Sequence, residues 1–308
     1  LFIFLISFLF GNWLNEGLSD IFYITWALMI FASGREFLLQ IGKGLGSVRF
    51  TSLVRVTLPL LFAFSIIFIS FFYKLTVLNT VTAYFLTIFI CTLSLIASLK
   101  PRFSNFKTRT RTIFRKNRDY GIKVYFSHIT ANTWPEFIIF FIPFFASLGD
   151  LGFYKVSLML IAPLGLISQN IGFYFFRSFA QSSSIKRRIL LGNLLILSLI
   201  LILYVLFISP ILVLTFGEEY NSSLPLIYIM VIGALFNGLY QIPDNYMNSN
   251  SHGKYVLYSS IIMGLTALIF GSVLIPLFGI YGAAYTFVIG NFSYFLSIHF
   301  FYLRVKTN

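Results

Sequence analysis

Long apolar stretches recur along the chain, each about as long as a membrane crossing requires. A helix rises about 1.5 Å per residue and the hydrocarbon core of a bilayer is about 30 Å thick, so one crossing needs roughly 20 mostly apolar residues. We expect a transmembrane helix wherever such a stretch occurs. The nine full spans predicted in this way are Asp20 to Gln40, Arg55 to Tyr73, Leu75 to Leu99, Tyr125 to Leu148, Gly152 to Ala180, Ile189 to Phe216, Leu224 to Met247, Tyr255 to Phe278, and Tyr281 to Leu303.

The chain opens on a further apolar run, Leu1 to Phe10, that is too short to cross a bilayer. A signal peptide would need a basic segment before this run and a small-residue cleavage site after it, and neither precedes Gly11. We therefore expect the run to be the second half of a broken span. This interpretation predicts that the chain lacks its natural N-terminus.

The composition fits this pattern. Hydrophobic residues make up 58% of the 308 residues and charged residues 10%, against roughly 45–50% and about 25% in a soluble domain. An aqueous core cannot hide so much apolar side chain. The predicted fold class is therefore all-α: a polytopic integral membrane protein with about nine full transmembrane helices and a partial one.

The charges are distributed unevenly along this threading. The formal net charge is +13, and most basic residues fall in alternate connections, with only Lys74 and Lys155 on the opposite side. Because Lys and Arg beside a span resist translocation, this segregation predicts a cytoplasmic C-terminus. Basic residues in short loops between apolar spans do not form the soluble basic face that nucleic acid requires, so nucleic acid is not an expected partner.

The longest connection, Lys100 to Lys123, is strongly basic and divides the spans into two groups. We interpret residues 1–99 as the remainder of an N-terminal helical lobe, residues 100–124 as a basic cytoplasmic connection, and residues 125–308 as a C-terminal six-helix lobe. The connection is expected to be a solvated loop that binds anionic lipid headgroups, or an amphipathic helix in the membrane interface.

Two acids lie inside predicted spans, where an ionisable group costs about 2.5–3.5 kcal/mol. Glu136 is either a proton or cation site, or an acid satisfied by a hydrogen bond or by an ion pair with Lys155. Asp244 follows Pro243 in the polar sequence QIPDNYMNSN, so it is either a transport residue or a locally satisfied acid at a helix break. Glu136 and Asp244 are the candidate ion-coupling residues.

Four basic residues are candidates for binding an anionic substrate. Lys155 and Arg177 lie near opposite ends of one predicted span, and Arg35 and Arg55 lie near inner span ends. One interpretation is that these side chains reach the headgroups at the two interfaces. The other is that they form a basic cavity that offsets the charge of a diphosphate.

Enzyme and metal chemistry has little support in the sequence. Cys91 is the single cysteine, and His128, His252 and His299 lack metal-ligand spacing, so neither a metal nor a cofactor is expected. The chain has no P-loop, no glycine-rich nucleotide turn and no carboxylate pair in an extramembrane loop. His128 and Asn132 stand one helical turn apart, as buried hydrogen-bonded pairs often do.

Several motifs in the C-terminal half resemble those of known transporters. The motifs are FGEEY after a span (from Phe216), an inner loop ending in Gly253-Lys254, the turn IPLFGIYGAA (Ile275 to Ala284) with a final apolar hairpin, and LGDLGFYKVSLML (from Leu148) upstream. In these features the chain resembles polysaccharide flippases of the O-antigen and exopolysaccharide type. These proteins belong to the multidrug, oligosaccharidyl-lipid and polysaccharide exporter superfamily.

The resemblance implies two helical lobes around a central cavity that opens alternately to each side of a bacterial cytoplasmic membrane. The implied cargo is an undecaprenyl-diphosphate-linked oligosaccharide for cell-surface polysaccharide synthesis, with the polysaccharide polymerase machinery as a further candidate partner. A cation-coupled multidrug exporter of the same superfamily and a lipid II type flippase remain alternatives. A membrane polysaccharide polymerase or acyltransferase is a third, although no catalytic constellation supports it.

Overall fold

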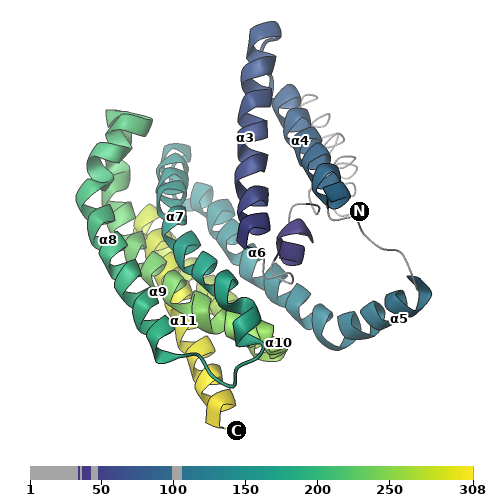
Figure 1. The fold of residues 1–308 in the computed structure, drawn as a ribbon. Helices are drawn as coiled ribbons and strands as arrows, with labels where there is room; N and C mark the ends of the chain where they lie inside the picture. Colours follow the sequence, from purple (N-terminus) through teal and green to yellow (C-terminus); the bar gives the residue numbers. More distant parts are fainter. Residues whose placement is uncertain (1–33, 35–36, 43–47, 99–105, 308) are drawn as a thin grey trace. The chain divides into compact units, whose positions relative to one another are not determined.

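The computed structural model describes residues 34, 37–42, 48–98 and 106–307, and this part of the chain is helical, without strands (Figure 1). The all-α fold class is thus confirmed for the described residues. The chain divides into two compact units, Leu1–Asn105 and Phe106–Asn308. The expectations for the run from Leu1 to Phe10 and for Arg35 fall on residues outside the described part, as does most of the predicted span from Asp20 to Gln40.

The first unit contains a pair of long apolar helices, α3 (Val48–Phe72) and α4 (Val77–Ser98). The two helices pack against each other. Leu58 of α3 forms a buried cluster with Ile88 and Cys91 of α4. Cys91 therefore serves as a small apolar side chain in a helix contact, in agreement with its position in an apolar run.

The second unit contains the remaining helices, with α9 in contact with α7, α8, α10 and α11. One continuous apolar core runs through this unit. The elements of the second unit are α5 (Phe106–Lys116), η1 (Asn117–Gly121), α6 (Ile122–Phe145), α7 (Leu148–Phe179), α8 (Arg187–Phe216), η2 (Glu218–Ser223), α9 (Leu224–Ser249), α10 (Gly253–Phe278) and α11 (Ile280–Thr307).

Seven helices of the described part are long and apolar enough to cross a membrane: α3, α4, α7, α8, α9, α10 and α11. The chain is thus a multi-pass membrane protein by the length and composition of its helices. The predicted span from Tyr125 to Leu148 coincides with α6, but the apolar part of that helix is only Thr133–Phe145. Its first half, which begins at Ile122, carries several polar residues, of which Ser127 is buried.

Helix α7 begins at Leu148, four residues before the predicted start at Gly152. The reason is a capping box. The Ser147 hydroxyl accepts a hydrogen bond from the Asp150 amide at 3.1 Å, and the Asp150 carboxylate accepts one from the Ser147 amide at 2.9 Å. These bonds satisfy amide groups that a helix start leaves unpaired, so the helix extends into polar sequence that hydropathy alone excludes.

The turn between α10 and α11 depends on two glycines. Gly279 has a φ of +56°, a backbone conformation that residues with a side chain rarely adopt. Gly282 lies so close to α10 that a Cβ atom there would collide with the Leu274 carbonyl. Ala283 and Ala284 follow with no exposed surface, so small residues allow the two helices to approach closely.

The basic connection before α6 is helical where it is described. The segment Phe106–Lys116 forms α5, and the π-helical turn η1 joins it to α6 without a break. Of the two expectations for this connection, an amphipathic helix describes Phe106–Lys116 and a loop does not. Arg111, Arg115 and Arg118 lie along one hollow of this surface, and Ile113 exposes 66% of its surface.

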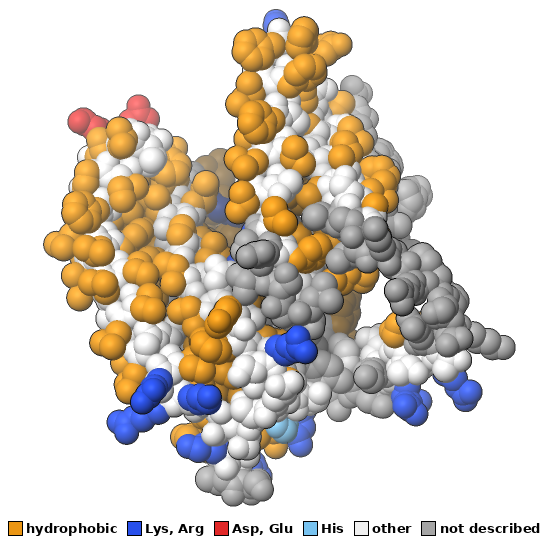
Figure 2. Space-filling model, viewed as in Figure 1, with side chains coloured by type: hydrophobic (Ala, Val, Ile, Leu, Met, Phe, Trp, Pro, Cys, Tyr) orange, Lys and Arg blue, Asp and Glu red, His pale blue; other side chains and the backbone are white. Residues whose placement is uncertain are grey.

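Charge is segregated along the second unit. In Figure 2 the Lys and Arg side chains of this unit gather mostly at one end, and acidic side chains gather at the other. The acidic end carries Glu218 and Glu219 in η2, whereas the opposite end carries the start of α8 at Arg187 and the end of α11 at Arg304. The second unit therefore has the charge asymmetry that the positive-inside rule describes.

Candidate binding cavity

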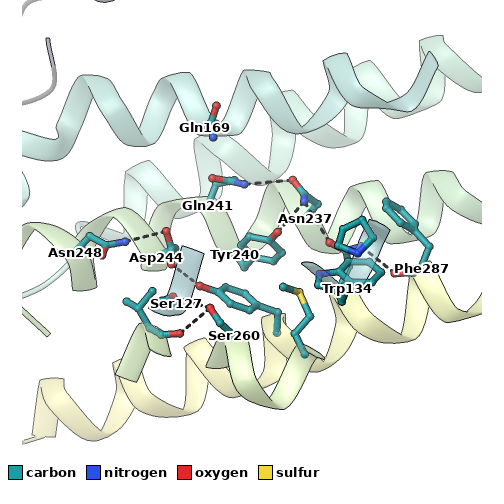
Figure 3. A pocket seen from close by; sticks show the side chains of 15 residues that line it. Ser127, Trp134, Gln169, Asn237, Tyr240, Gln241, Asp244, Asn248, Ser260 and Phe287 are labelled. Carbon is teal, nitrogen blue, oxygen red and sulfur yellow. Dashed lines mark hydrogen bonds between the residues drawn. The ribbon is translucent and has the colours of Figure 1, made fainter. Parts of the chain in front are cut away.

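A cavity of about 300 Å³ lies within the second unit, among the helices α6, α7, α9, α10 and α11 (Figure 3). Its lining is polar although the surrounding helices are apolar. None of the described residues that line it is a lysine or an arginine. These residues are Ser127, Trp134, Pro135, Gln169, Asn237, Tyr240, Gln241, Asp244, Asn248, Val256, Ser260, Met263, Phe287, Asn291 and Tyr294.

Asp244 is the one acid in this lining, and both of its carboxylate oxygens accept hydrogen bonds. The Tyr294 hydroxyl of α11 donates to one oxygen at 2.6 Å, and the Asn248 side chain donates to the other at 3.1 Å. The Tyr240 ring lies 4.4 Å from the Tyr294 ring. The sequence identified Asp244 and its neighbour Asn248, but it gave no indication of the tyrosine on another helix.

Amide side chains form a second network beside Asp244 (Figure 3). The side-chain nitrogen of Asn237 donates to the Tyr240 hydroxyl at 2.8 Å and to the side-chain oxygen of Asn291 at 3.2 Å. The side-chain nitrogen of Gln241 donates to the side-chain oxygen of Asn237 at 3.3 Å. The Asn291 amide in turn donates to the Phe287 backbone carbonyl at 2.9 Å. Each amide is held by its neighbours, so the side chains that face the cavity have fixed orientations.

The spacing of these residues explains why they face the same space. On α9, the positions 237, 240, 241, 244 and 248 recur at intervals of three and four, which places them on one face of a helix. On α11, positions 287, 291 and 294 do the same. Sequence reasoning missed Asn237, Asn291 and Tyr294. A search for polar residues at helical spacing inside apolar spans would have found both stripes.

Aromatic and hydroxyl side chains complete the cavity. The Trp134 ring of α6 is 5% exposed and lies 6.0 Å from the Phe287 ring of α11. The hydroxyls of Ser127 on α6 and Ser260 on α10 are hydrogen bonded at 2.7 Å. The cavity thus offers amide, phenol and hydroxyl groups next to the faces of aromatic rings. Such a set suits a ligand with many hydroxyl groups and apolar C–H faces better than it suits a polyanion.

Glu136 does not face this cavity. It is exposed on α6, and helical geometry places it opposite the buried residues Trp134 and Ile138. Within the described part of the chain, Glu136 and Lys155 form no ion pair, so the pairing considered for them is absent there. Asp244 is the one predicted ion-coupling residue that the structure places in the cavity.

The predicted substrate-binding cations lie elsewhere. Lys155 and Arg177 are exposed near opposite ends of α7, about 33 Å apart at the rise of a helix. At this separation along α7 the two side chains would not meet at one diphosphate. Arg55 is partly buried in α3 of the other unit, and Arg35 lies outside the described residues. Any role for each of them in substrate binding stays a prediction.

His252 lies in the connection between α9 and α10, outside the membrane-spanning segments. Partial burial lowers the pKa of its imidazole below the ordinary value, and the positive charge of Lys254 lowers it further. The folded chain therefore favours the neutral form of this histidine. Within the described residues no group of three or more His, Cys, Asp or Glu side chains could hold a metal ion.

Comparisons of the chain with protein-family models, with curated proteins and with solved structures found no match.

Proposed function

We propose that the chain is a multi-pass membrane transporter that flips an undecaprenyl-diphosphate-linked oligosaccharide from the cytoplasmic to the outer face of a bacterial cytoplasmic membrane. It would work by alternating access between two helical lobes with about nine full spans in this chain, and its C-terminus would be cytoplasmic. The observation that carries the proposal is the amide-rich cavity inside the apolar second unit.

A polar cavity in a membrane protein calls for a functional explanation. Without water in the hydrocarbon core, each unsatisfied polar group costs several kcal/mol, so polar side chains between transmembrane helices are few and often mark a substrate path. Here five amides line one cavity. Packing the helices together would need none of them, and apolar residues of similar size would fill the space at lower cost.

The chemistry of the lining matches the saccharide part of such a cargo. Amides and phenols both donate and accept hydrogen bonds, as sugar hydroxyls do, so sugar hydroxyls could replace the bonds that these side chains make to one another. The rings of Trp134 and Phe287 provide apolar surface for the C–H faces of a sugar. The lining therefore favours a glycan over an aliphatic or anionic cargo.

The diphosphate would be held outside this cavity, because the described residues of the lining include an acid and no base. Three cations lie beside a single hollow, Arg111 and Arg115 of α5 and Arg118 of η1. Guanidinium groups bind phosphate oxygens in bidentate geometry. This basic helix would also attract anionic lipids of the inner leaflet, at about 1 kcal/mol for each Lys or Arg near the surface.

A specific observation also favours the alternative of a cation-coupled multidrug exporter. Asp244 would attract a cationic drug or a coupling cation into the cavity, and its carboxylate already accepts a hydrogen bond from Tyr294. The two functions predict different phenotypes. A drug exporter would protect cells against cationic compounds and would not change the distribution of lipid-linked glycans.

The test is to delete the gene and to measure undecaprenyl-linked repeat units on each leaflet, with an enzyme that cleaves only the outer pool in spheroplasts. We expect these lipids to accumulate on the inner leaflet and the wild-type protein to restore the outer pool. The double variant Asn237→Ala, Asn291→Ala should fail to do so, whereas Asn221→Ala, which alters an exposed amide in η2, should restore it. Unchanged leaflet distribution on deletion would refute the proposal. If cells instead became sensitive to cationic drugs, the exporter would take its place.

A further inference from the structure

Helices α6 and α10 pack along a seam that has a different surface on each side. On one side, Ser127 and Ser260 line the polar cavity. On the other side, the same two helices form an apolar groove of about 320 Å³, lined among others by Thr133, Phe137 and Leu265. Trp134 lines both the cavity and the groove. Polar and apolar spaces therefore meet at one tryptophan.

The groove presents almost only hydrocarbon. Thr130 and Thr133 donate their hydroxyls to the carbonyls of their own helix, at 2.9 and 2.7 Å, so their hydroxyls are already satisfied. Ile261, Leu265 and Leu268 of α10 are 38%, 55% and 40% exposed along it. A groove of this chemistry binds an aliphatic chain and offers nothing to a sugar or a phosphate.

Helices α6 and α10 pack against each other along an extensive seam, but several of the side chains that meet beside the groove are small. The Ser127 and Ser260 hydroxyls form one hydrogen bond at 2.7 Å. Next to it, Gly264 lies so near Thr130 that a Cβ atom there would be 3.0 Å from the threonine methyl group. Pro135 removes a backbone hydrogen bond from α6 in the same region, which makes that helix easier to bend. These small side chains and the bend allowed by Pro135 favour opening of the seam at the level of Trp134.

We propose that the groove holds the polyprenyl chain of the transported lipid while its saccharide occupies the cavity, and that the lipid passes between α6 and α10 at Trp134. The inference rests on the proposed function. A single amphiphile explains why a hydrocarbon groove and a glycan-like cavity share a wall residue. The acyl chain of a bulk phospholipid would fill the groove as well, but its headgroup would have no reason to reach the cavity.

The test locks the seam with a disulfide. In the full-length protein with Cys91→Ala, we would introduce Ser127→Cys and Ser260→Cys. The two hydroxyls are 2.7 Å apart, so the two thiols would be close enough to bond. The flipping rate of undecaprenyl-diphosphate-linked oligosaccharide is then compared in the same proteoliposomes before oxidation, after oxidation, and after reduction with dithiothreitol. The two single-cysteine variants control for oxidation without a cross-link.

We expect oxidation to lower the flipping rate of the double variant at least tenfold, and reduction to restore it. Undiminished flipping with the cross-link formed would overturn the inference and leave the proposed function intact. If the wild-type protein flipped nothing, the proposed function itself would be wrong. The two failures are therefore distinguishable.

A second measurement covers the case in which the double variant is misfolded. Wild-type protein in vesicles of phosphatidylglycerol and phosphatidylethanolamine is irradiated with an undecaprenyl phosphate that carries a diazirine on its chain. We expect labels on α6 and α10 around Leu265 and Leu268, competed by unlabelled undecaprenyl phosphate. The exposed apolar face of α8, including Leu195 and Leu206, serves as the control surface. Equal labelling of α8 would show bulk lipid in the groove and overturn the inference.

Discussion

The hydrogen bond between Tyr294 and Asp244 gives a quantitative test of the cavity. The substitution Tyr294→Phe removes one hydroxyl and keeps a ring that is 4% exposed and packed on Tyr240. The bond is short, 2.6 Å, and its acceptor is a carboxylate. After the substitution, Asp244 keeps the bond from Asn248 at 3.1 Å. The variant therefore loses one charge-assisted bond while the packing stays in place.

Two ranges bracket the loss in the free energy of unfolding that we expect for Tyr294→Phe. A hydrogen bond to a charged group contributes about 1.5–3 kcal/mol in soluble proteins. Hydrogen bonds between membrane helices average only about 0.6 kcal/mol, with a maximum of about 1.7 kcal/mol, because the unfolded chain in a membrane also finds partners. For a carboxylate in a polar cavity we expect a loss of about 1–2 kcal/mol, which is roughly a 5- to 30-fold change in the folding equilibrium.

The assay is reversible unfolding in mixed detergent micelles, with a double-mutant cycle of Tyr294→Phe and Asp244→Ala. The two substitutions should be non-additive by about 1–2 kcal/mol. Tyr204→Phe is the matched control, because the Tyr204 hydroxyl is buried without a hydrogen-bond partner in the described part of the chain. That variant should be as stable as the wild type or more so. Additivity within about 0.5 kcal/mol, or equal effects of the two tyrosine substitutions, would refute the reasoning.

Three further predictions concern the fold. Gly282→Ala should destabilise the protein by about 1–3 kcal/mol, since its Cβ would collide with the backbone of α10; Gly192→Ala, which meets no atom within 4 Å, should be neutral or stabilising in the same unfolding assay. Ser147→Ala should cost about 1 kcal/mol by loss of the α7 cap, and an unchanged unfolding midpoint would contradict this. The lowered pKa of His252 means that the neutral form stabilises the fold above the ordinary histidine pKa, and this contribution is lost as pH falls through the lowered value. The His252→Gln variant should therefore lose less stability than the wild type between pH 7.5 and pH 5, as measured by unfolding at each pH.

The sequence predicted the seven helices of the described part that are long and apolar enough to cross a membrane, because hydropathy and helix length are local properties. It placed α8 and α10 within two residues of their observed ends. It did not predict that α7 begins at Leu148, because that start depends on the Ser147 cap and not on apolar residues. Nor did it predict that the basic connection continues into α6 as one helical segment.

The cavity was only partly predictable. Asp244 attracted notice because a single acid in an apolar span is costly. Asn237 and Asn291 each look unremarkable on their own helix, and they become a site only because α9 packs against α11. That pairing of helices is a tertiary property with no signal in local hydropathy. Lys155 and Arg177 drew attention by charge, but their positions near the ends of α7 keep them apart.

The uninterrupted run from Phe106 through η1 to Phe145 has a mechanical consequence. If a flexible loop preceded α6, that helix could rotate about its axis without moving the preceding segment. Because α5, η1 and α6 are continuous, a rotation of one helix is passed on to the other. Any change of angle between α5 and α6 has to be absorbed within the five residues of η1. An anionic surface that attracted the arginines of α5 would therefore also act on the helix that carries Trp134, and the effect would weaken as ionic strength rises.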